Sequence, residues 1–174
     1  MDIIRIGDKV VSRERIVHAI DRILELRASG LPQQEVAARM AIDRAFVSKV
    51  ESMGEVRRGG RVALIGFPVG NKEELRRVAS SEGVDLILLM NDEERWDFVR
   101  GKSGDVLLNE IMGLIAEAKN YDVVVFIGSD MRIKLAEALL GPKVVGIELG
   151  ISPIKEDKYV DPNMLRDTIR SLRV

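Results

Sequence analysis

From residue 61 onward, short unbroken runs of apolar residues alternate with stretches in which apolar residues recur at helical spacing. An unbroken apolar run is typical of a strand that is covered on both faces, as in a parallel sheet. Four such runs occur, at residues 61–67, 85–90, 122–128 and 143–149. Helices are expected over residues 72–82, 105–119 and 131–140, and in a last segment that begins at Asp161 and Pro162. The alternation predicts an α/β domain, with a small parallel, Rossmann-like sheet and helices on both faces.

The first 54 residues have a mainly helical period. Residues 12–28 place Ile16, Ile20 and Ile23 on one face, which predicts a long helix. Two shorter helices are expected over residues 33–40 and 44–52. A small hairpin can form over residues 3–6 and 9–11, although an isolated two-stranded ribbon is marginal by itself. We therefore assign residues 1–54 to a domain that is in essence all-α.

Two adjacent glycines, Gly59 and Gly60, break the helical period and predict a linker over residues 55–61. The second domain then spans residues 62–174. Charge divides in the same way: residues 1–61 contain 12 Lys and Arg against 9 Asp and Glu, whereas residues 62–174 contain 15 against 19. The N-terminal part is therefore the part that suits a polyanion.

Composition excludes several kinds of chemistry. The chain has no cysteine, which removes disulfides, thiol catalysis and thiolate metal sites, and its one histidine, His18, cannot form a histidine cluster. We expect no metal and no cofactor. No run reaches the roughly 18 apolar residues that a membrane span needs, and the first residues lack the apolar core of a secretory signal. We expect a cytoplasmic protein without a membrane partner.

The two short helices fit the packing of a helix-turn-helix. That motif needs a small residue where the helices approach, apolar residues inside, and polar or long side chains on the outer face of the second helix. Ala37 is the small residue, and Ile42 is the apolar residue of the turn. The inner face of the second helix has Val47 and Val50. Its outer face has Arg44, Ala45, Ser48 and Lys49.

From Gly30 to Glu51, the spacing Gly-Leu-x-Gln-x-Glu-Val-Ala-x-x-Met-x-Ile-x-x-x-x-Val-Ser-x-Val-Glu resembles the helix-turn-helix of phage repressors, of the Cro-like or XRE type. The resemblance covers about residues 12–54. It implies a transcription regulator that binds a double-stranded DNA operator. It also implies that Gln33 holds a phosphate and that Arg44, Ala45 and Lys49 read base edges.

Side-chain chemistry agrees with these roles. The guanidinium of Arg44 can grip O6 and N7 of guanine, the methyl of Ala45 can touch a thymine methyl, and Ser48 can contact a phosphate or a base. Arg57 and Arg58 either neutralise flanking phosphates or lie in a solvated hinge. The family usually has further helices that make the dimer contact, but here the helical pattern ends at Gly54. We therefore expect the α/β domain to form a homodimer.

In an open parallel sheet, ligands bind outside the carboxyl ends of the strands. There the sequence places glycines, polar residues and basic side chains, which predict a site for a small effector that is anionic or nucleotide-like. These residues are Gly66, Phe67, Gly70, Asn71, Lys72, Asp92, Gly128, Ser129, Asp130 and Arg132. The same residue types also serve simply to turn the chain, and the spacing matches neither a dinucleotide fingerprint nor a Walker motif. Both interpretations stay open.

The sequence thus predicts a sequence-specific DNA-binding regulator, not an enzyme, whose α/β domain dimerises and senses a small ligand. Two alternatives remain. One is an enzyme that uses a nucleotide or sugar phosphate and carries a helical appendage. The other is an adaptor whose helix-turn-helix surface binds another protein.

Overall fold

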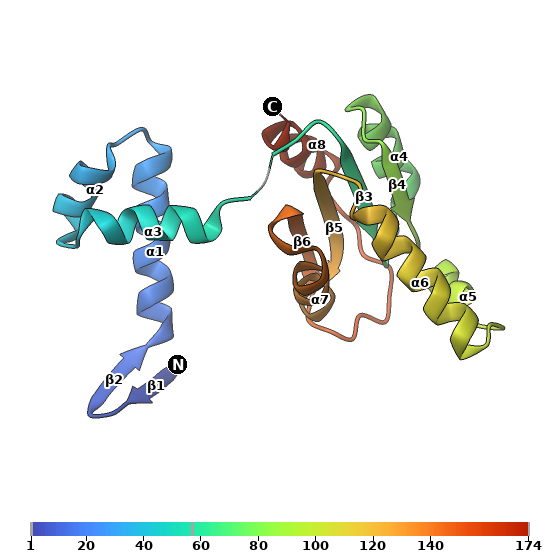
Figure 1. The fold of residues 1–174 in the computed structure, drawn as a ribbon, viewed down its shortest axis with the longest axis horizontal. Coiled ribbons are helices and arrows are strands. Elements are labelled where there is room, and N and C mark those ends of the chain that lie inside the picture. Colours follow the sequence, from blue (N-terminus) through green and yellow to red (C-terminus); the bar gives the residue numbers. More distant parts are fainter. Residues whose placement is uncertain (1, 57, 174) are drawn as a thin grey trace. The chain divides into compact units, whose positions relative to one another are not determined.

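The computed structural model describes residues 2–56 and 58–173, and the chain divides into two units, Met1–Glu55 and Val56–Val174 (Figure 1). Over the described residues the first unit holds a hairpin and three helices, and the second holds a four-stranded sheet with helices around it. Within these residues, no helix has the length and apolar character that crossing a membrane requires.

The first unit begins with an antiparallel hairpin of β1 (Ile3–Ile6) and β2 (Lys9–Ser12), in which Ile3 lies opposite Ser12. Gly7 has a φ of 59° and so supplies the left-handed residue that the tight turn needs. The predicted hairpin is confirmed. The expectation of an all-α unit is not confirmed, because this two-stranded ribbon precedes the helices.

Three helices follow: α1 (Arg13–Ala28), α2 (Gln33–Met40) and α3 (Arg44–Gly54). The hydroxyl of Ser12 caps α1 by accepting the backbone N–H of Arg15 at 3.3 Å. Apolar side chains from all three helices form one buried cluster. They are Ile23, Leu26, Val36, Ala37 and Val47.

Between α2 and α3 the chain turns at Ala41, which has φ 53° and ψ 45°. This left-handed conformation is usual for glycine and uncommon for alanine. It lets the N–H of Ile42 donate to the carbonyl of Ala37 at 3.0 Å, which closes the end of α2. The turn thereby brings the buried side chain of Val47 against the same core as Val36.

The second unit contains four parallel strands in the order β4-β3-β5-β6. Their bounds are β3 Val62–Gly66, β4 Leu86–Leu89, β5 Val123–Ser129 and β6 Val144–Gly150. The register sets Val62 beside Val123 and Ala63 beside Leu86. The parallel sheet that the apolar runs predict is confirmed. The connections leave in opposite directions between β3 and β5, so the ligand-binding end of such a sheet lies at their carboxyl ends.

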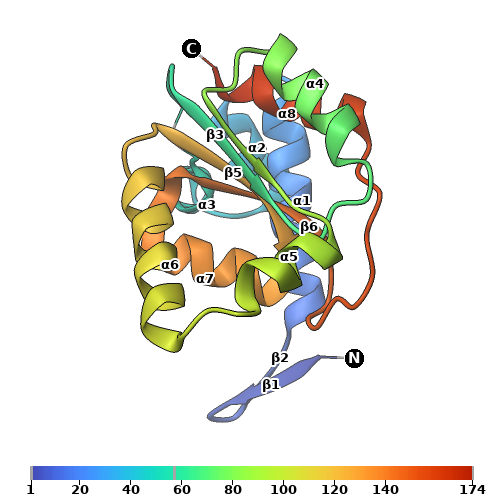
Figure 2. The same cartoon turned by 90° about the vertical axis from the view of Figure 1, so that its right-hand side faces the viewer.

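Helices cover both faces of the sheet, as predicted (Figure 2). On one face, Val62 and Leu64 pack with α4 (Lys72–Ser81) and α8 (Pro162–Leu172). On the other face, Ala63 and Ile65 pack with the end of α6 (Gly104–Ala118) and with α7 (Asp130–Leu140). This alternation follows from the pleat, which sends successive side chains to opposite faces.

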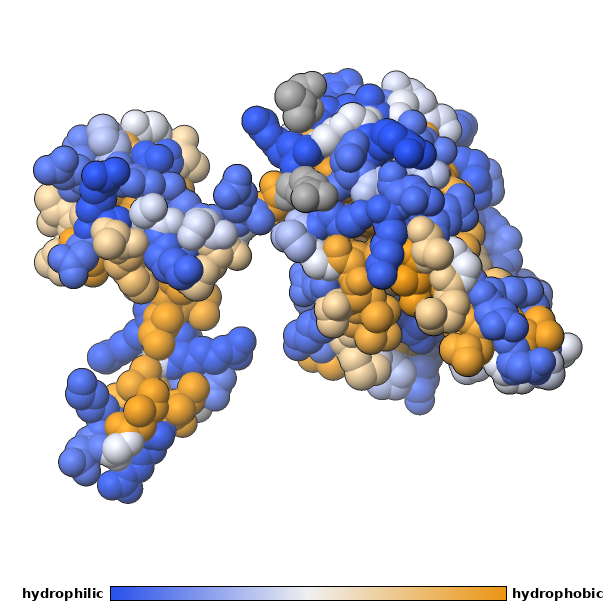
Figure 3. Space-filling view, in the orientation of Figure 1, coloured by the Kyte–Doolittle hydropathy of each residue, from blue (hydrophilic) through white to orange (hydrophobic). Residues whose placement is uncertain are grey.

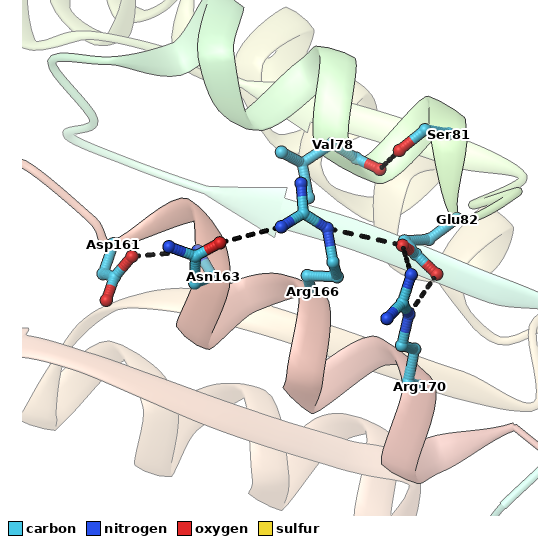
Figure 4. A network of polar contacts seen from close by, with 7 residues as sticks. All are labelled: Val78, Ser81, Glu82, Asp161, Asn163, Arg166 and Arg170. Atoms are coloured by element: carbon cyan, nitrogen blue, oxygen red, sulfur yellow. Dashed lines mark hydrogen bonds and ion pairs between the residues drawn. The ribbon is translucent and has the colours of Figure 1, made fainter.

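A polar network holds α8 against α4 (Figure 4). The carboxylate of Glu82, at the end of α4, accepts N–H groups of Arg170 at 2.8 and 2.9 Å and lies 3.5 Å from Nε of Arg166. The hydrogen bonds from Arg170 lower the pKa of Glu82. The last helix of the chain is therefore fixed to the α/β unit by charge as well as by its apolar face.

One helix, α5 (Asp92–Val99), lies where no helix was expected. A capping box starts it, because the side chain of Asn91 accepts the N–H of Glu94 and the side chain of Glu94 accepts the N–H of Asn91. The one remaining element is a short 3-10 turn, Gly141–Lys143, before β6.

Candidate functional sites

The outer face of α3 is open. Arg44, Ala45, Ser48 and Lys49 are all exposed there, whereas Val47 and Val50 on the inner face are buried. The four residues that the sequence places on the outer face of this helix are therefore all accessible. Two of the four are basic, so this face is suited to a polyanion.

Gln33 links Arg44 on this surface to a half-buried ion pair between α1 and α3. Its amide donates to Oε2 of Glu51 at 2.7 Å and accepts Nε of Arg44 at 3.4 Å. Arg27 pairs with the other oxygen of Glu51. The hydrogen bonds from Arg27 and Gln33 lower the pKa of Glu51, so its carboxylate stays charged and anchors the network.

The network orients the guanidinium of Arg44. Only its Nε takes part, and among the described residues its two terminal nitrogens make no hydrogen bond. These are groups that a guanidinium uses to grip a guanine or a phosphate. Gln33, predicted as a phosphate contact, thus also has an internal role that the sequence did not indicate.

The predicted linker is partly tied to the second unit. Gly59 donates its N–H to the carbonyl of Leu172 at 3.2 Å, and a Cβ at Gly59 would come within 2.2 Å of Cβ of Asp122. The N–H of Arg61 donates to the carboxylate of Asp122 at 2.9 Å. Arg58 is exposed between these contacts and the first unit. Arg57, the other predicted phosphate contact, lies outside the described residues.

A cavity of about 320 Å³ opens at the carboxyl ends of β3 and β5. Four of the predicted ligand residues lie together in its wall. They are Phe67, Asp92, Ser129 and Arg132. The strand ends therefore do converge on a hollow, as expected for a sheet in which the connections diverge between β3 and β5.

The other predicted residues of the first loop are occupied by the protein itself. Lys72 pairs with Glu94, and the N–H of Gly70 donates to the carbonyl of Lys158 at 2.9 Å. The amide of Asn71 donates to Glu74 at 3.0 Å and also exchanges hydrogen bonds with the backbone of Val160. The segment before α8, together with Glu74 of α4 and Glu94 of α5, thus takes up the groups that were predicted to hold a phosphate.

The remaining three predicted residues shape the site from outside the cavity. A Cβ at Gly66 would come within 2.9 Å of Cβ of Ile127, and one at Gly128 within 2.9 Å of the Phe126 ring, so both glycines serve close packing. Asp130 accepts the N–H of Ser152 at 2.8 Å. This bond, together with one from the N–H of Met131, lowers the pKa of Asp130, and it positions the segment that follows β6.

Sequence reasoning missed most of the cavity wall. Arg95 and Trp96 come from α5, and Ser152 and Lys155 come from the irregular segment after β6. The pattern Asn-x-x-Glu at residues 91–94 is a helix-start signal and could have revealed α5. The irregular segment has no apolar period from which its position could have been predicted.

Positive charge dominates the cavity. Arg95 is 12% exposed and pairs with Asp92, whereas Arg132 makes no hydrogen bond or ion pair with any residue that the structure describes. The guanidinium of Arg132 lies 5.0 Å from the centre of the Phe67 ring. Partial desolvation lowers the pKa of Arg132, and the nearby charge of Arg95 lowers it further. An anion at this place would favour the charged guanidinium and so oppose both effects.

Ser129 adds an unused hydroxyl. The residue is 1% exposed and precedes α7 at the N-cap position, but its side chain does not cap the helix. Within the described residues, its Oγ has no hydrogen-bond partner. A buried polar atom without a partner is rare in proteins, so this hydroxyl is a candidate ligand contact.

The chain matches no family model, and comparison with curated proteins and with solved structures finds no match. The fold and the cavity define an α/β unit with a four-stranded parallel sheet and a polar hollow at its carboxyl end. The resemblance of residues 12–54 to phage repressors stays a prediction.

Proposed function

We propose that the chain is a sequence-specific DNA-binding transcription regulator. The observation that carries the proposal is the outer face of α3, where Arg44, Ala45, Ser48 and Lys49 are exposed together while the inner face packs on α1 and α2. A short helix with this division can enter the major groove of DNA with its outer side chains against the base edges.

The polar network supports the same role. Gln33, whose amide donates to Glu51, accepts Nε of Arg44 and leaves the terminal nitrogens of this guanidinium free to bind. A reader that is held in place loses less conformational entropy when it binds. Arg57 and Arg58 would add phosphate contacts from the linker, with the salt dependence that such contacts bring.

A single reader of this size makes few contacts, so useful affinity requires two copies that read half-sites one helical turn apart, roughly 34 Å. In this proposal the α/β unit pairs two copies as a homodimer and catalyses no reaction. Ligand binding in the cavity would shift the spacing of the two readers and so change the affinity for the operator.

The surface of α6 supports pairing through the α/β unit. Only Ala118 of this helix is fully buried, while Val106, Leu108 and Met112 are exposed. These side chains continue the apolar side of the helix beyond the part that faces the sheet, and an exposed apolar strip of this kind is suited to cover by another chain. Figure 3 shows apolar surface on this unit and also on the first unit. We assign the cover of α6 to a second copy of the chain.

The readers can be tested by replacing Arg44 and Lys49 with alanine in the full chain. Duplexes are first selected from a random pool with the wild-type protein, and affinities are then measured at fixed salt. We expect the double variant to lose about 2–4 kcal/mol, roughly 30-fold or more in affinity, because it loses base-edge contacts.

The matched control replaces Arg77 and Lys119, which removes the same two charges from exposed positions of the second unit. This control should bind like the wild type. If the Arg44 and Lys49 variant keeps its fold and still binds the selected duplex normally, α3 is not the reader. If the wild type selects no duplex at all, the regulator proposal is wrong and the adaptor alternative gains support.

A further inference from the structure

The polar cavity adjoins a second, apolar one. The second cavity has a volume of about 310 Å³ and lies between the sheet and the helices α5, α6 and α7. Its wall is apolar apart from two arginines. Four residues line both cavities, namely Phe67, Arg95, Val99 and Arg132. The two volumes therefore meet where the arginines lie, and each is large enough for part of a small molecule.

Charge at the junction favours an anion. The polar cavity is lined by three basic side chains, Arg95, Arg132 and Lys155, and by one acidic side chain, Asp92. Asp92 is already paired with Arg95. Arg132 is partly open to solvent and has no counter-ion among the described residues, so its guanidinium is free to bind a ligand at the junction.

The chemistry of the apolar cavity favours a ligand with an apolar body. Its floor is Ile65, Leu88 and Phe126 of the sheet, and its far side includes Ile111 and Ile115 of α6. Such a space gains free energy when it is filled by hydrocarbon. An inorganic anion would leave it empty.

We propose that these joined cavities bind a small organic anion with an apolar body. Its carboxylate or phosphate group lies against the guanidinium of Arg132 and the hydroxyl of Ser129, and its hydrocarbon part lies under α6. This inference names the class of effector for the proposed regulator, and it rests on that function only for the biological role of the ligand. Because α6 would contact the ligand on one side and a second copy on the other, the ligand and the pairing of subunits are coupled.

Trp96 provides the measurement, because it is the one tryptophan of the chain and lines the polar cavity. The full-length protein is titrated with octanoate, inorganic phosphate and 1-octanol while its tryptophan fluorescence is recorded. Octanoate has both parts of the proposed ligand, phosphate has only the charge, and octanol has only the chain. We expect a saturable change with octanoate, and binding at least tenfold weaker with each of the other two.

Two variants test the contacts. Arg132→Gln should weaken octanoate binding at least tenfold, and Ser129→Ala should weaken it several-fold. Arg100→Gln is the matched control: Arg100 lies 5.8 Å from the centre of the Trp96 ring but is exposed and lines neither cavity. It should leave octanoate binding unchanged. Circular dichroism of each variant checks that the fold is intact.

Each contrary result would overturn one part of the proposed ligand site. If octanol binds as tightly as octanoate, no anion site exists. If phosphate binds as tightly, the apolar cavity takes no part. Normal octanoate binding by folded Arg132→Gln removes this arginine from the site, and no saturable response to octanoate rejects the proposal. The titration contains no DNA, so its failure is distinguishable from a failure of the selected-duplex experiment.

Discussion

Ala41 shows how one residue sets the angle between two helices. Its φ of 53° allows the bond from the Ile42 N–H to Ala37 and directs the chain into α3. A left-handed conformation costs a non-glycine residue roughly 1–2 kcal/mol. The proposed reading surface therefore depends on a turn that is held in place by the packing of Ile42 and Val47.

We predict that Ala41→Gly stabilises the first unit by about 1 kcal/mol, because glycine adopts this conformation without a steric cost, although it loses more entropy on folding. Amide hydrogen exchange of α2 and α3 in the full chain measures the change locally. Ala38→Gly is the control, since Ala38 is exposed in the same helix at an ordinary helical position. There glycine should destabilise by about 1 kcal/mol. Faster exchange in both variants would contradict the assigned strain.

At the scale of an element, α5 carries the missed part of the cavity. It has no fully buried residue, so its packing on the sheet adds little, and its start depends on the capping box of Asn91 and Glu94. Lys72 pairs with Glu94 and lowers the pKa of its carboxyl, which keeps it charged for this bond. The position of Arg95 and Trp96 therefore depends on a few polar contacts at one end of the helix.

We predict that Asn91→Ala destabilises this end of α5 by about 1 kcal/mol, the usual cost of a lost N-cap. Trp96 should become more mobile, which is measurable as a drop in tryptophan fluorescence anisotropy. Glu93→Ala, at an exposed position of the same first turn, should leave the anisotropy unchanged. An unchanged anisotropy in Asn91→Ala would show that other contacts hold the helix.

The same helix explains what the sequence could and could not predict. The strands were predictable because burial on both faces requires unbroken apolar runs such as residues 122–128. The place of Phe67, Ser129 and Arg132 in the cavity wall was predictable because a parallel sheet brings its strand ends together. The place of Arg95 in the cavity wall was not predictable, since α5 is partly exposed and its apolar residues show little helical periodicity. The place of Lys155 was not predictable either, since an irregular segment has no periodicity of apolar residues.

At the scale of the whole molecule, each unit exposes apolar side chains that suit the proposed pairing with a second copy. The hairpin of the first unit exposes Ile6 and Val10, and α6 of the second exposes Leu108 and Met112. Either surface would serve for pairing. They differ in that a two-stranded ribbon is only marginally stable, whereas α6 is a helix of 15 residues that also closes the apolar cavity.

If α6 pairs two copies, charges on its outer side should separate them. We predict that Leu108→Asp with Met112→Asp converts a dimer to a monomer, because a carboxylate in an apolar interface is desolvated without a partner. Light scattering measures the mass. Affinity for a duplex with two half-sites should fall about 100-fold or more toward that of a single half-site, because the second reader is no longer tethered. Neither residue lines the cavities, so octanoate binding should persist in the monomer.

Two comparisons make this prediction specific to α6. Met164→Asp introduces a charge at a similarly exposed methionine of α8 and should leave the dimer intact. Ile6→Asp with Val10→Asp makes the same change on the hairpin and should also leave it intact. A monomer from the hairpin variant and a dimer from the α6 variant would place the pairing in the first unit. The hairpins of the two first units would then set the distance between the two α3 helices. A ligand under α6 would not contact the surface that sets this distance.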